Sequence, residues 1–336
     1  MKMLLKRLLM ALPNLVGVVI VTFILTRALP GDPAAYFAGA AATPEAVEQV
    51  REQLGLNRPM LEQFFSYVRD LLQGNLGVSL ATGQAVTSEI AGRLPASLEL
   101  TLFALLMAVS VAIPLGVLAA TRPNSWADHG VRMLTTMGVS LPTFFTGLLL
   151  VYVFYYKLGW AASPNGRLDA FLISPPTVTG FYLIDSLLAG DLQVFWASLK
   201  QLLLPAITLA LFVLAPLARM TRASMLGVLS SDFIRTARAS GLAPGTVLYT
   251  YALRNALLPV ITTLGMVFSF LLGSNVLVEK VFAWPGIGSF AIESLVASDY
   301  APVQGFVLTM AVLYVLLNLL IDLAYTWLDP RIGLDA

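Results

Sequence analysis

The sequence lacks cysteine altogether and contains a single histidine, His129. The absence of cysteine excludes disulfides, thiolate metal sites and a cysteine nucleophile. One histidine cannot supply a multi-histidine metal site within a single copy of the chain. His129 follows Asp128 between two apolar runs, which indicates a solvated loop histidine.

A phosphate-binding loop is also missing. The Walker A pattern needs a lysine directly after a glycine. None of the five lysines follows one; they are Lys2, Lys6, Lys157, Lys200 and Lys280. The chain therefore cannot bind and hydrolyse ATP in the P-loop manner, and any ATPase that drives it is another polypeptide.

Charge is scarce. Only 12% of the residues are charged and 58% are hydrophobic, against about a quarter and about half in soluble domains. A soluble fold could not cover that much apolar surface with polar groups, so lipid is the expected outer solvent. The net charge of +1 gives no reason to expect nucleic acid as a partner.

Six runs are uncharged and long enough to cross the hydrocarbon core as helices, which takes about 18 residues or more. They contain prolines that are typical of bent spanning helices, at 114, 142, 205 and 216. The sequence therefore predicts an all-α, polytopic membrane protein with six transmembrane helices. The runs are Leu8–Thr26, Leu100–Thr121, Met133–Tyr156, Gln201–Ala218, Asn255–Val278 and Tyr300–Ile321.

The first run could also be a secretory signal, because Lys2, Lys6 and Arg7 precede it. Its apolar stretch is longer than the usual signal core of about 7–15 residues. The nearest A-x-A triplet, Ala38-Gly39-Ala40, lies well beyond it. We expect a retained first membrane helix.

Basic residues set the expected orientation, because short cytoplasmic loops are enriched in Lys and Arg. Both termini are expected on the cytoplasmic side, which places there Lys2, Lys6, Arg7, Arg122, Arg132, Arg219, Arg222, Arg235, Arg238, Arg254 and Arg331. Four tryptophans close to run ends agree with an interfacial belt: Trp160, Trp196, Trp284 and Trp327.

Two longer segments then lie outside. Thr43-Pro44-Glu45 predicts a helix start, and Gly55 predicts its end. Arg58 to Gln73 forms a second amphipathic stretch, closed by Gly74. The segment Lys157–Lys200 contains an expected interfacial helix through Phe181–Leu187.

The longest cytoplasmic segment, Arg219–Arg254, predicts two short helices joined at a glycine turn. Ser231 or Asp232 can cap the first, and Gly241 would end it. The second, Thr246–Leu258, leads into the fifth span. From the residues alone, this segment is either an ordinary positive-inside loop or a docking element for a soluble motor. In the second case, the small residues of the first helix would let the surface of the motor protein approach closely.

The stretch from Phe233 to Gly241, followed by Arg254–Pro259, resembles the coupling motif of ABC-importer permeases. In that motif a glutamate and two alanines precede a glycine, with a leucine-proline pair downstream. Here Arg235 stands at the glutamate position and Thr236 replaces the first alanine, as is usual in the dipeptide/oligopeptide/nickel branch. The departure puts in doubt any salt bridge that the glutamate makes elsewhere.

Further stretches resemble the same branch, and Thr179-Gly180-Phe181 with Leu183-Ile184-Asp185 looks most like its dipeptide permease subgroup. Each stretch alone could be an ordinary turn; their joint occurrence in order carries the resemblance. The others are Leu29–Pro33, Leu54–Leu56 with Pro59, Phe282–Gly288, Asp299-Tyr300 with Val303–Gly305, and Asp329–Arg331.

The resemblance implies a type I importer permease fold, with a first helix and extracytoplasmic segment over 1–95, a transmembrane domain over 96–328 and a cytoplasmic tail over 329–336. Its coupling loop spans 219–254, and the coupling helices over 231–250 would dock on a separate ATPase. The implied docking residues are Arg235, Thr236, Ala237, Arg238, Ala239 and Gly241.

The resemblance also implies the partners. They are a second, homologous permease subunit forming a heterodimer, one or two P-loop ATPases that bind ATP and Mg, and an extracytoplasmic peptide-binding protein. No cofactor is expected on this chain itself, which would sit in a bacterial inner membrane. Dipeptides or short oligopeptides are the expected cargo; nickel, glutathione or another small solute are the alternatives within the family.

Two other classes of membrane protein require residues that this sequence does not show. A secondary transporter or channel would act alone, but proton coupling needs a titratable group in the membrane, the predicted spans have none, and no internal repeat is visible. An intramembrane protease needs paired acids, a metal triad or a serine–histidine pair, and none is evident.

Polar residues inside the spans either line a passage or bond across helices. The pathway candidates are Ser140, Thr143, Ser269, Ser274 and Asn275.

Overall fold

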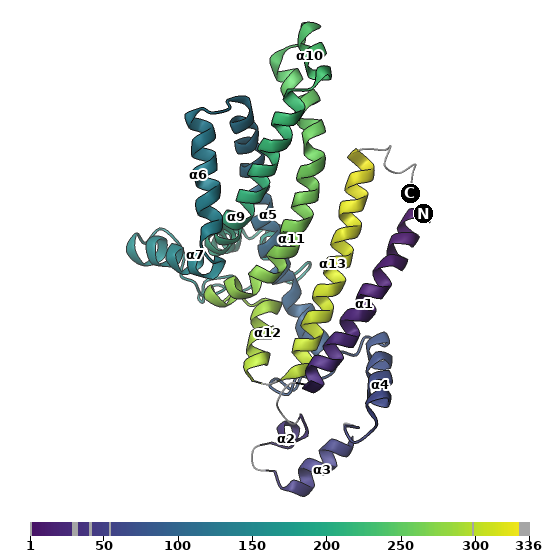
Figure 1. Ribbon diagram of the computed structural model, residues 1–336. Coiled ribbons are helices and arrows are strands. Elements are labelled where there is room, and N and C mark those ends of the chain that lie inside the picture. Colours follow the sequence, from purple (N-terminus) through teal and green to yellow (C-terminus); the bar gives the residue numbers. More distant parts are fainter. Residues whose placement is uncertain (1, 29–32, 40–41, 54, 298, 329–336) are drawn as a thin grey trace. The chain divides into compact units, whose positions relative to one another are not determined.

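The computed structural model describes residues 2–28, 33–39, 42–53, 55–297 and 299–328 (Figure 1). Over these ranges the regular structure is helical and contains no strand, which confirms the all-α class. The chain divides into two compact units: Met1–Leu94 with Ile287–Val315, and Pro95–Gly286 with Leu316–Ala336. The stretches 29–32 and 329–331 and the expected tail 329–336 lie outside the described residues.

The first unit contains the N-terminal helices. It comprises α1 (Lys2–Ala28), α2 (Pro33–Ala38), α3 (Pro44–Gln53), α4 (Met60–Leu72), the start of α5 (Val86–Thr121), α12 (Ile287–Val296) and the first part of α13 (Tyr300–Leu328). Phe23 of α1 packs against Phe64 and Tyr67 of α4, with ring centroids 5.2 and 5.7 Å apart. A second apolar cluster joins Val86 and Ile90 to Ile287 and Phe290.

Local signals set the ends of α3 and α4. Thr43 Oγ1 accepts a hydrogen bond from the backbone N–H of Ala46, as an N-cap does. Gly55 and Gly74 have φ values of +66° and +76°, a region that glycine adopts without the steric cost of a Cβ. The predicted helices at Thr43–Gly55 and Arg58–Gly74 are thereby confirmed.

The second unit is a bundle around α9 (Leu192–Leu229), which packs against α11 (Arg254–Val281), α6 (Trp126–Ser140), α7 (Thr143–Leu150) and α8 (Tyr182–Leu188). Two π-helical segments extend it: η1 (Val151–Lys157) continues α7, and η2 (Thr246–Leu253) precedes α11. The short helix α10 (Asp232–Ala239) lies between α9 and η2 in the chain.

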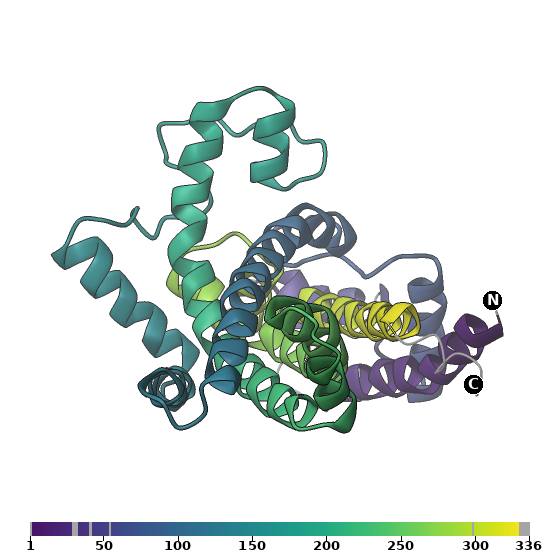
Figure 2. The ribbon, with the colours of Figure 1, turned by 90° about the horizontal axis from the view of Figure 1, so that it is seen from above.

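Small residues let α5 and α9 come close together. Ala104, Ala108 and Ala112 recur at every fourth position of α5 and are fully buried, because residues four apart share one face of a helix. At Gly116 a Cβ would lie only 2.5 Å from the Cβ of Thr221. Figure 2 shows α5, in blue, beside α9, in teal to green. Such small-residue contacts are typical of helix packing in membranes.

In the described part of the chain, four helices are long and apolar enough to cross a membrane: Val86–Thr121, Leu192–Leu229, Thr246–Val281 and Tyr300–Ile321. They contain the second, fourth, fifth and sixth predicted runs. The first run lies in α1, whose described apolar stretch, Leu12–Leu25, is shorter. The total of six spans therefore stays a prediction.

The third predicted run, Met133–Tyr156, is not one continuous helix. The chain leaves the helical conformation at Leu141 (φ −113°, ψ 142°) and resumes it at Thr143. Proline disfavours a helical conformation in the residue before it and removes a backbone donor, so Pro142 separates α6 from α7. By contrast, Pro114, Pro205 and Pro216 lie inside continuous helices.

Candidate functional site

The helix α10 lies at one end of the second unit, where the chain turns from α9 toward α11 (Figure 1). Ile234 is fully buried and Ala237 is 7% exposed. Three residues apart, they share a face of the helix. They pack with Met225 of α9 and with Val247 and Ala252 of η2. This buried face attaches α10 to both helices between which it is inserted.

The opposite face of α10 is open. Phe233, Arg235, Thr236, Arg238 and Ala239 are all exposed. Arg235 forms an ion pair of 3.3 Å with Asp232, and both side chains are largely in solvent, so the pair contributes about 0–1 kcal/mol at most. The guanidinium thus remains available to a partner.

Gly241 ends the turn after α10 with φ +74°, and its N–H bonds to the carbonyl of Arg238. A Cβ at this position would meet no atom within 4 Å. The glycine is therefore needed for the backbone conformation of the turn. The docking residues inferred from sequence thus separate into an exposed set, to which Gly241 belongs, and Ala237, which packs inside the chain.

A hollow of about 720 Å³ lies beside α10. Most of its lining is apolar, and Arg238 brings a charge to it. Four parts of the chain bound it: the end of α5 with the residues after it, the end of α9, the end of α10 with the turn after it, and the start of η2. The lining residues are Ala120, Thr121, Pro123, Leu226, Leu229, Ser230, Arg238, Leu242, Pro244, Val247 and Leu248. The exposed surface near α10 therefore combines a cation with an apolar concavity.

A buried carboxylate ties α6 to α9. Asp128 accepts hydrogen bonds from Arg222 Nε at 2.6 Å and Nη2 at 2.8 Å, and from Arg132 Nη2 at 2.9 Å. The backbone N–H of Asn124 adds a fourth, at 3.0 Å. These contacts, led by that of Arg222, hold the pKa of the Asp128 carboxyl well below its ordinary value. Neighbouring His129 is exposed, as the sequence predicts, but it lies within α6 and not in a loop.

Sequence reasoning missed this anchor because its partners are 94 residues apart. A local signal was present: Ser125 Oγ accepts from the N–H of Asp128, and Ser-x-x-Asp is the pattern of a capped helix start. The pattern marks the beginning of α6 but does not reveal Arg222 as the partner.

A second buried ion pair involves the segment between η1 and α8. Arg167 Nη2 lies 2.6 Å from Glu99 Oε2, and both side chains are buried. Arg167 also donates to the carbonyl of Gly180 and lies over the ring of Tyr182, 3.6 Å from its centroid. Glu99 accepts in addition from the N–H of Leu183. The pair thus fastens the residues around α8 to α5.

Glu279 forms a neighbouring polar cluster. This fully buried carboxylate accepts from Ser97 Oγ at 2.5 Å and from Asn275 Nδ2 at 3.0 Å. Asn275 also donates to Thr101 Oγ1 at 3.1 Å. Buried charges persist only when such partners surround them, so the cluster holds α5 against α11. Glu99 and Glu279 stand just outside the uncharged runs, so the sequence places them at the ends of the predicted spans but does not reveal their partners.

The aromatic belt expected from sequence does not include Trp284. Its side chain is 1% exposed, and its Nε1 donates to the carbonyl of Ala96 at 2.9 Å. Position near the end of an apolar run cannot distinguish an interfacial tryptophan from one buried at the end of a helix bundle.

The five pathway candidates have separate surroundings. Asn275 is buried in the Glu279 cluster. The hydroxyls of Ser140, Ser269 and Ser274 each donate to the carbonyl four residues earlier in their own helix. Thr143 is the first residue of α7, directly after the break at Pro142. A role in lining a pathway stays a prediction for all five.

Comparison with known proteins gives the family. A family model described as a binding-protein-dependent transport system inner membrane component matches residues 112–334. A second, described as the N-terminal part of a binding-protein-dependent transport system membrane component, matches residues 1–101. Together the two models account for nearly the whole chain.

Curated relatives agree with the family models. The probable D,D-dipeptide transport system permease protein DdpB of Escherichia coli (strain K12) is 48% identical over 317 residues, which cover 94% of this chain and 93% of the relative. The di/tripeptide transport system permease protein DppB of Pseudomonas aeruginosa (strain UCBPP-PA14) is 42% identical, covering 97% of both chains. The dipeptide transport system permease protein DppB of Alkalihalophilus pseudofirmus is 40% identical, covering 97% of this chain and 98% of the relative.

The resemblance drawn from the motifs is confirmed by these matches. Three findings agree on a membrane-spanning transport component. They are the apolar helices of spanning length, the two family models, and the relatives that align over almost their full lengths. The chain therefore belongs to the family of binding-protein-dependent transport system inner membrane components, as a multi-pass permease of the inner membrane.

Proposed function

We propose that the chain is the permease subunit of an ATP-driven ABC importer that moves dipeptides or short oligopeptides across the inner membrane. The relatives that align over nearly the whole chain carry dipeptide, D,D-dipeptide or di/tripeptide transport in their names. These names favour peptide cargo over nickel, glutathione or another small solute. They also favour a component of a larger system over a carrier that acts alone.

The observation that carries the coupling mechanism is the two-faced character of α10. Its buried face, through Ile234 and Ala237, is packed on α9 and η2. Its exposed face presents Phe233, Arg235 and Arg238. Close-packed interiors transmit displacement because they have little free volume. A partner that moved α10 would therefore move α9 and α11 with it, as rigid bodies.

That partner is a separate P-loop ATPase, which supplies the sites for ATP and Mg. One or two such ATPase subunits take part in the importer. The absence of a glycine-lysine pair supports this assignment, since the chain cannot form a Walker A loop. The basic residues of α10 and of the short loops support a cytoplasmic position for this face and for both termini. A second, homologous permease subunit and an extracytoplasmic peptide-binding protein complete the importer.

The test compares two small-to-Glu substitutions in the assembled importer, reconstituted in proteoliposomes with its ATPase and binding protein. Ala239→Glu changes the exposed face of α10. Gly92→Glu is the matched control, an exposed position near the other end of α5 where a Cβ would meet no atom within 4 Å. Ala237 is not used, because a buried glutamate there would detach α10 from its own chain.

We expect Ala239→Glu to reduce ATP-dependent dipeptide uptake at least ~10-fold, while Gly92→Glu leaves it unchanged. The reason is that a charge at a close-packed protein interface is desolvated without a partner, which costs several kcal/mol. Membrane insertion of both variants is checked by their yield in the membrane fraction. Normal uptake by the Ala239→Glu importer would show that α10 is not the docking element.

A further inference from the structure

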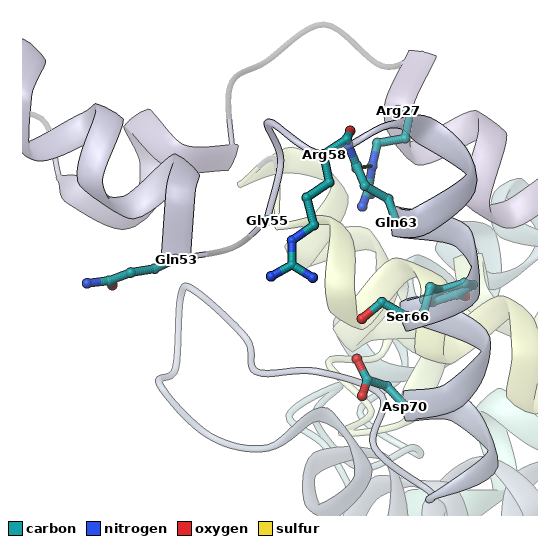
Figure 3. A pocket seen from close by; sticks show the side chains of 8 residues that line it. Arg27, Gln53, Gly55, Arg58, Gln63, Ser66 and Asp70 are labelled. Atoms are coloured by element: carbon teal, nitrogen blue, oxygen red, sulfur yellow. Dashed lines mark hydrogen bonds between the residues drawn. The ribbon is translucent and has the colours of Figure 1, made fainter.

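A polar pocket of about 240 Å³ lies in the first unit, between the end of α1, the turn that joins α3 to α4, and α4 itself (Figure 3). Its lining is rich in charged and amide side chains. Its lining residues are Arg27, Gln53, Gly55, Arg58, Gln63, Ser66, Tyr67 and Asp70.

The wall nearest α1 is held by Gln63. Its Oε1 accepts from Arg27 Nε at 3.1 Å, and its Nε2 donates to the carbonyls of Leu56 at 3.0 Å and Arg58 at 2.9 Å. Arg27 also lies over the ring of Phe23, 4.8 Å from its centroid. Gln63 thus connects the end of α1 and the α3–α4 turn to α4, and the polar groups of this wall are largely satisfied.

Two charged groups of the pocket have no partner within the described chain: Arg58, which is exposed, and Asp70, which is half-buried. In the described part of the chain, neither the Arg58 guanidinium nor the Asp70 carboxylate has a hydrogen-bond or ion-pair partner. Figure 3 shows Arg58 reaching from the turn, and Ser66 and Asp70 from α4, toward the same space. Arg58 leans against Gly55, whose Cβ would lie 3.4 Å from Arg58 Nε. A cation and an anion therefore face one pocket without pairing with each other.

Tyr67 adds a third unsatisfied group. Its hydroxyl oxygen is buried and has no hydrogen-bond partner among the described residues. Burial raises the pKa of Tyr67 to about 12, so the phenol keeps its proton at neutral pH and can donate. Because this oxygen is closed off from solvent, a ligand in the pocket does not reach it, and Tyr67 contributes to the wall of the pocket through the rest of its side chain.

We propose that this pocket binds a small zwitterion, with the ligand's anionic group on Arg58 and its ammonium group on Asp70. Two sources carry this chemistry. One is a free short peptide, whose termini are a carboxylate and an ammonium; the other is the headgroup of phosphatidylethanolamine, which offers a phosphate and an ammonium. The extracytoplasmic position of the pocket follows from the orientation given in the proposed function. No other part of this inference rests on that function.

The size of the pocket sets a limit on the ligand. Sites for drug-sized molecules usually span about 300–1,000 Å³, so a pocket of about 240 Å³ suits a dipeptide, a lipid headgroup or one end of a longer peptide. Hydrogen bonds in which one partner is charged are stronger than those between neutral groups. Loss of either charge is therefore expected to weaken binding at least ~10-fold.

The test measures equilibrium binding to the full chain in nanodiscs of phosphatidylglycerol, without ATPase or ATP. The probes are tritiated L-alanyl-L-alanine, its C-terminal amide and its N-acetyl form. The variants are Arg58→Gln and Asp70→Asn, and the matched controls on exposed positions of α4 are Arg69→Gln and Glu62→Gln. A lipid arm uses discs of mixed phosphatidylglycerol and phosphatidylethanolamine, and counts retained phosphatidylethanolamine by native mass spectrometry.

For a free peptide, Arg58→Gln should weaken binding of the dipeptide at least ~10-fold but leave binding of its amide unchanged. Asp70→Asn should weaken binding of the dipeptide but leave that of the N-acetyl form unchanged. For a headgroup, both variants should retain less phosphatidylethanolamine than the native chain. A change in binding in one arm alone identifies the ligand as a free peptide or as a lipid headgroup. The control variants should bind as the native chain does.

The charge-preserving variants Arg58→Lys and Asp70→Glu separate recognition from folding. They should restore at least part of the lost binding. If neither arm changes in Arg58→Gln and Asp70→Asn, or if the charge-preserving variants bind no better than the neutral ones, the pocket is not a zwitterion site. This test measures binding and not transport. A chain that fails to import peptides could still bind a zwitterion in this pocket, and a chain that imports peptides could fail to bind one there.

Discussion

The ion pair between Asp128 and Arg222 allows a quantitative test of how α6 is held to α9. Asp128→Asn keeps the size of the side chain but removes its charge. Asp128 is fully buried and Arg222 keeps 21% of its side chain exposed. Breaking a buried pair costs about 3–5 kcal/mol. Because Arg222 can be partly rehydrated, we expect a loss near the lower end, about 3 kcal/mol in the free energy of unfolding.

The pairing itself is isolated by a double-mutant cycle, measured as unfolding of the purified chain in detergent. The variants are Asp128→Asn, Arg222→Gln and the double variant. Removing both partners leaves no buried charge unpaired, because Arg132, which also bonds to Asp128, is largely exposed to water. The double variant should therefore be more stable than the sum of the single losses predicts, by about 1–3 kcal/mol. Strictly additive losses would show that the two side chains do not stabilise each other.

The same pair predicts a pH dependence of definite sign. The pKa of Asp128 is lower in the folded chain than in the unfolded one, where it is about 3.9. The stabilisation is therefore fully present above about pH 5 and is lost only as the pH falls through the depressed pKa. The deficit of Asp128→Asn should be constant between about pH 5 and 8 and should shrink in stronger acid. A deficit that changed steadily across neutral pH would contradict this assignment.

Three further substitutions test other contacts. Arg167→Gln leaves the buried Glu99 without its cation and should cost about 3–5 kcal/mol, detected as faster proteolysis of the segment 159–190; unchanged proteolysis would refute the fastening role. Gly116→Val places side-chain atoms against Thr221 and the Ala218 carbonyl and should abolish stable folding, whereas Gly92→Val should be tolerated; equal yields would contradict the close approach of α5 and α9. Gly241→Ala forces a Cβ into a left-handed turn and should destabilise the chain by about 1–2 kcal/mol, measured as a shift of the unfolding midpoint; an unchanged midpoint would argue against that backbone conformation.

The elements that sequence predicted well are those with local causes. Thr43 caps α3 through an N–H three residues away, and Gly55 and Gly74 end their helices through their own φ angles. The helix α10 likewise lies between Ser231 and Gly241 as expected. Each of these features depends on only a few consecutive residues, so a pattern of residue types is enough to locate it.

The features that sequence missed depend on residues far apart in the chain. Glu99 pairs with Arg167, 68 positions away, and Asp128 with Arg222, 94 positions away. No spacing rule connects such partners. The break at Pro142 was missed for a different reason: prolines at 205 and 216 carry the same local signal and yet lie within α9, so the residue type alone does not decide between a break and a continuous helix.

The candidate docking site was found by resemblance and refined by burial. The motif marks α10 correctly as a distinct helix, but it treats Ala237 and Ala239 alike. The structure separates them, since Ala237 packs with Val247 and Ala252 while Ala239 is exposed. A helix of eight residues turns each successive side chain by about 100°, and which face is covered depends on η2, which the motif does not include.

The proposal that α10 receives a separate ATPase is tested most directly by thiol accessibility, because the natural chain has no cysteine. Ala239→Cys and the control Gly92→Cys each introduce a single reactive thiol at an exposed position. Their rates of reaction with a membrane-impermeant maleimide are measured in inside-out vesicles, with and without the ATPase subunits. We expect the cysteine at 239 to react readily and to become protected when the ATPase binds. The cysteine at 92 should not react in these vesicles. A reaction rate at 239 that stays the same with the ATPase bound would contradict this proposal.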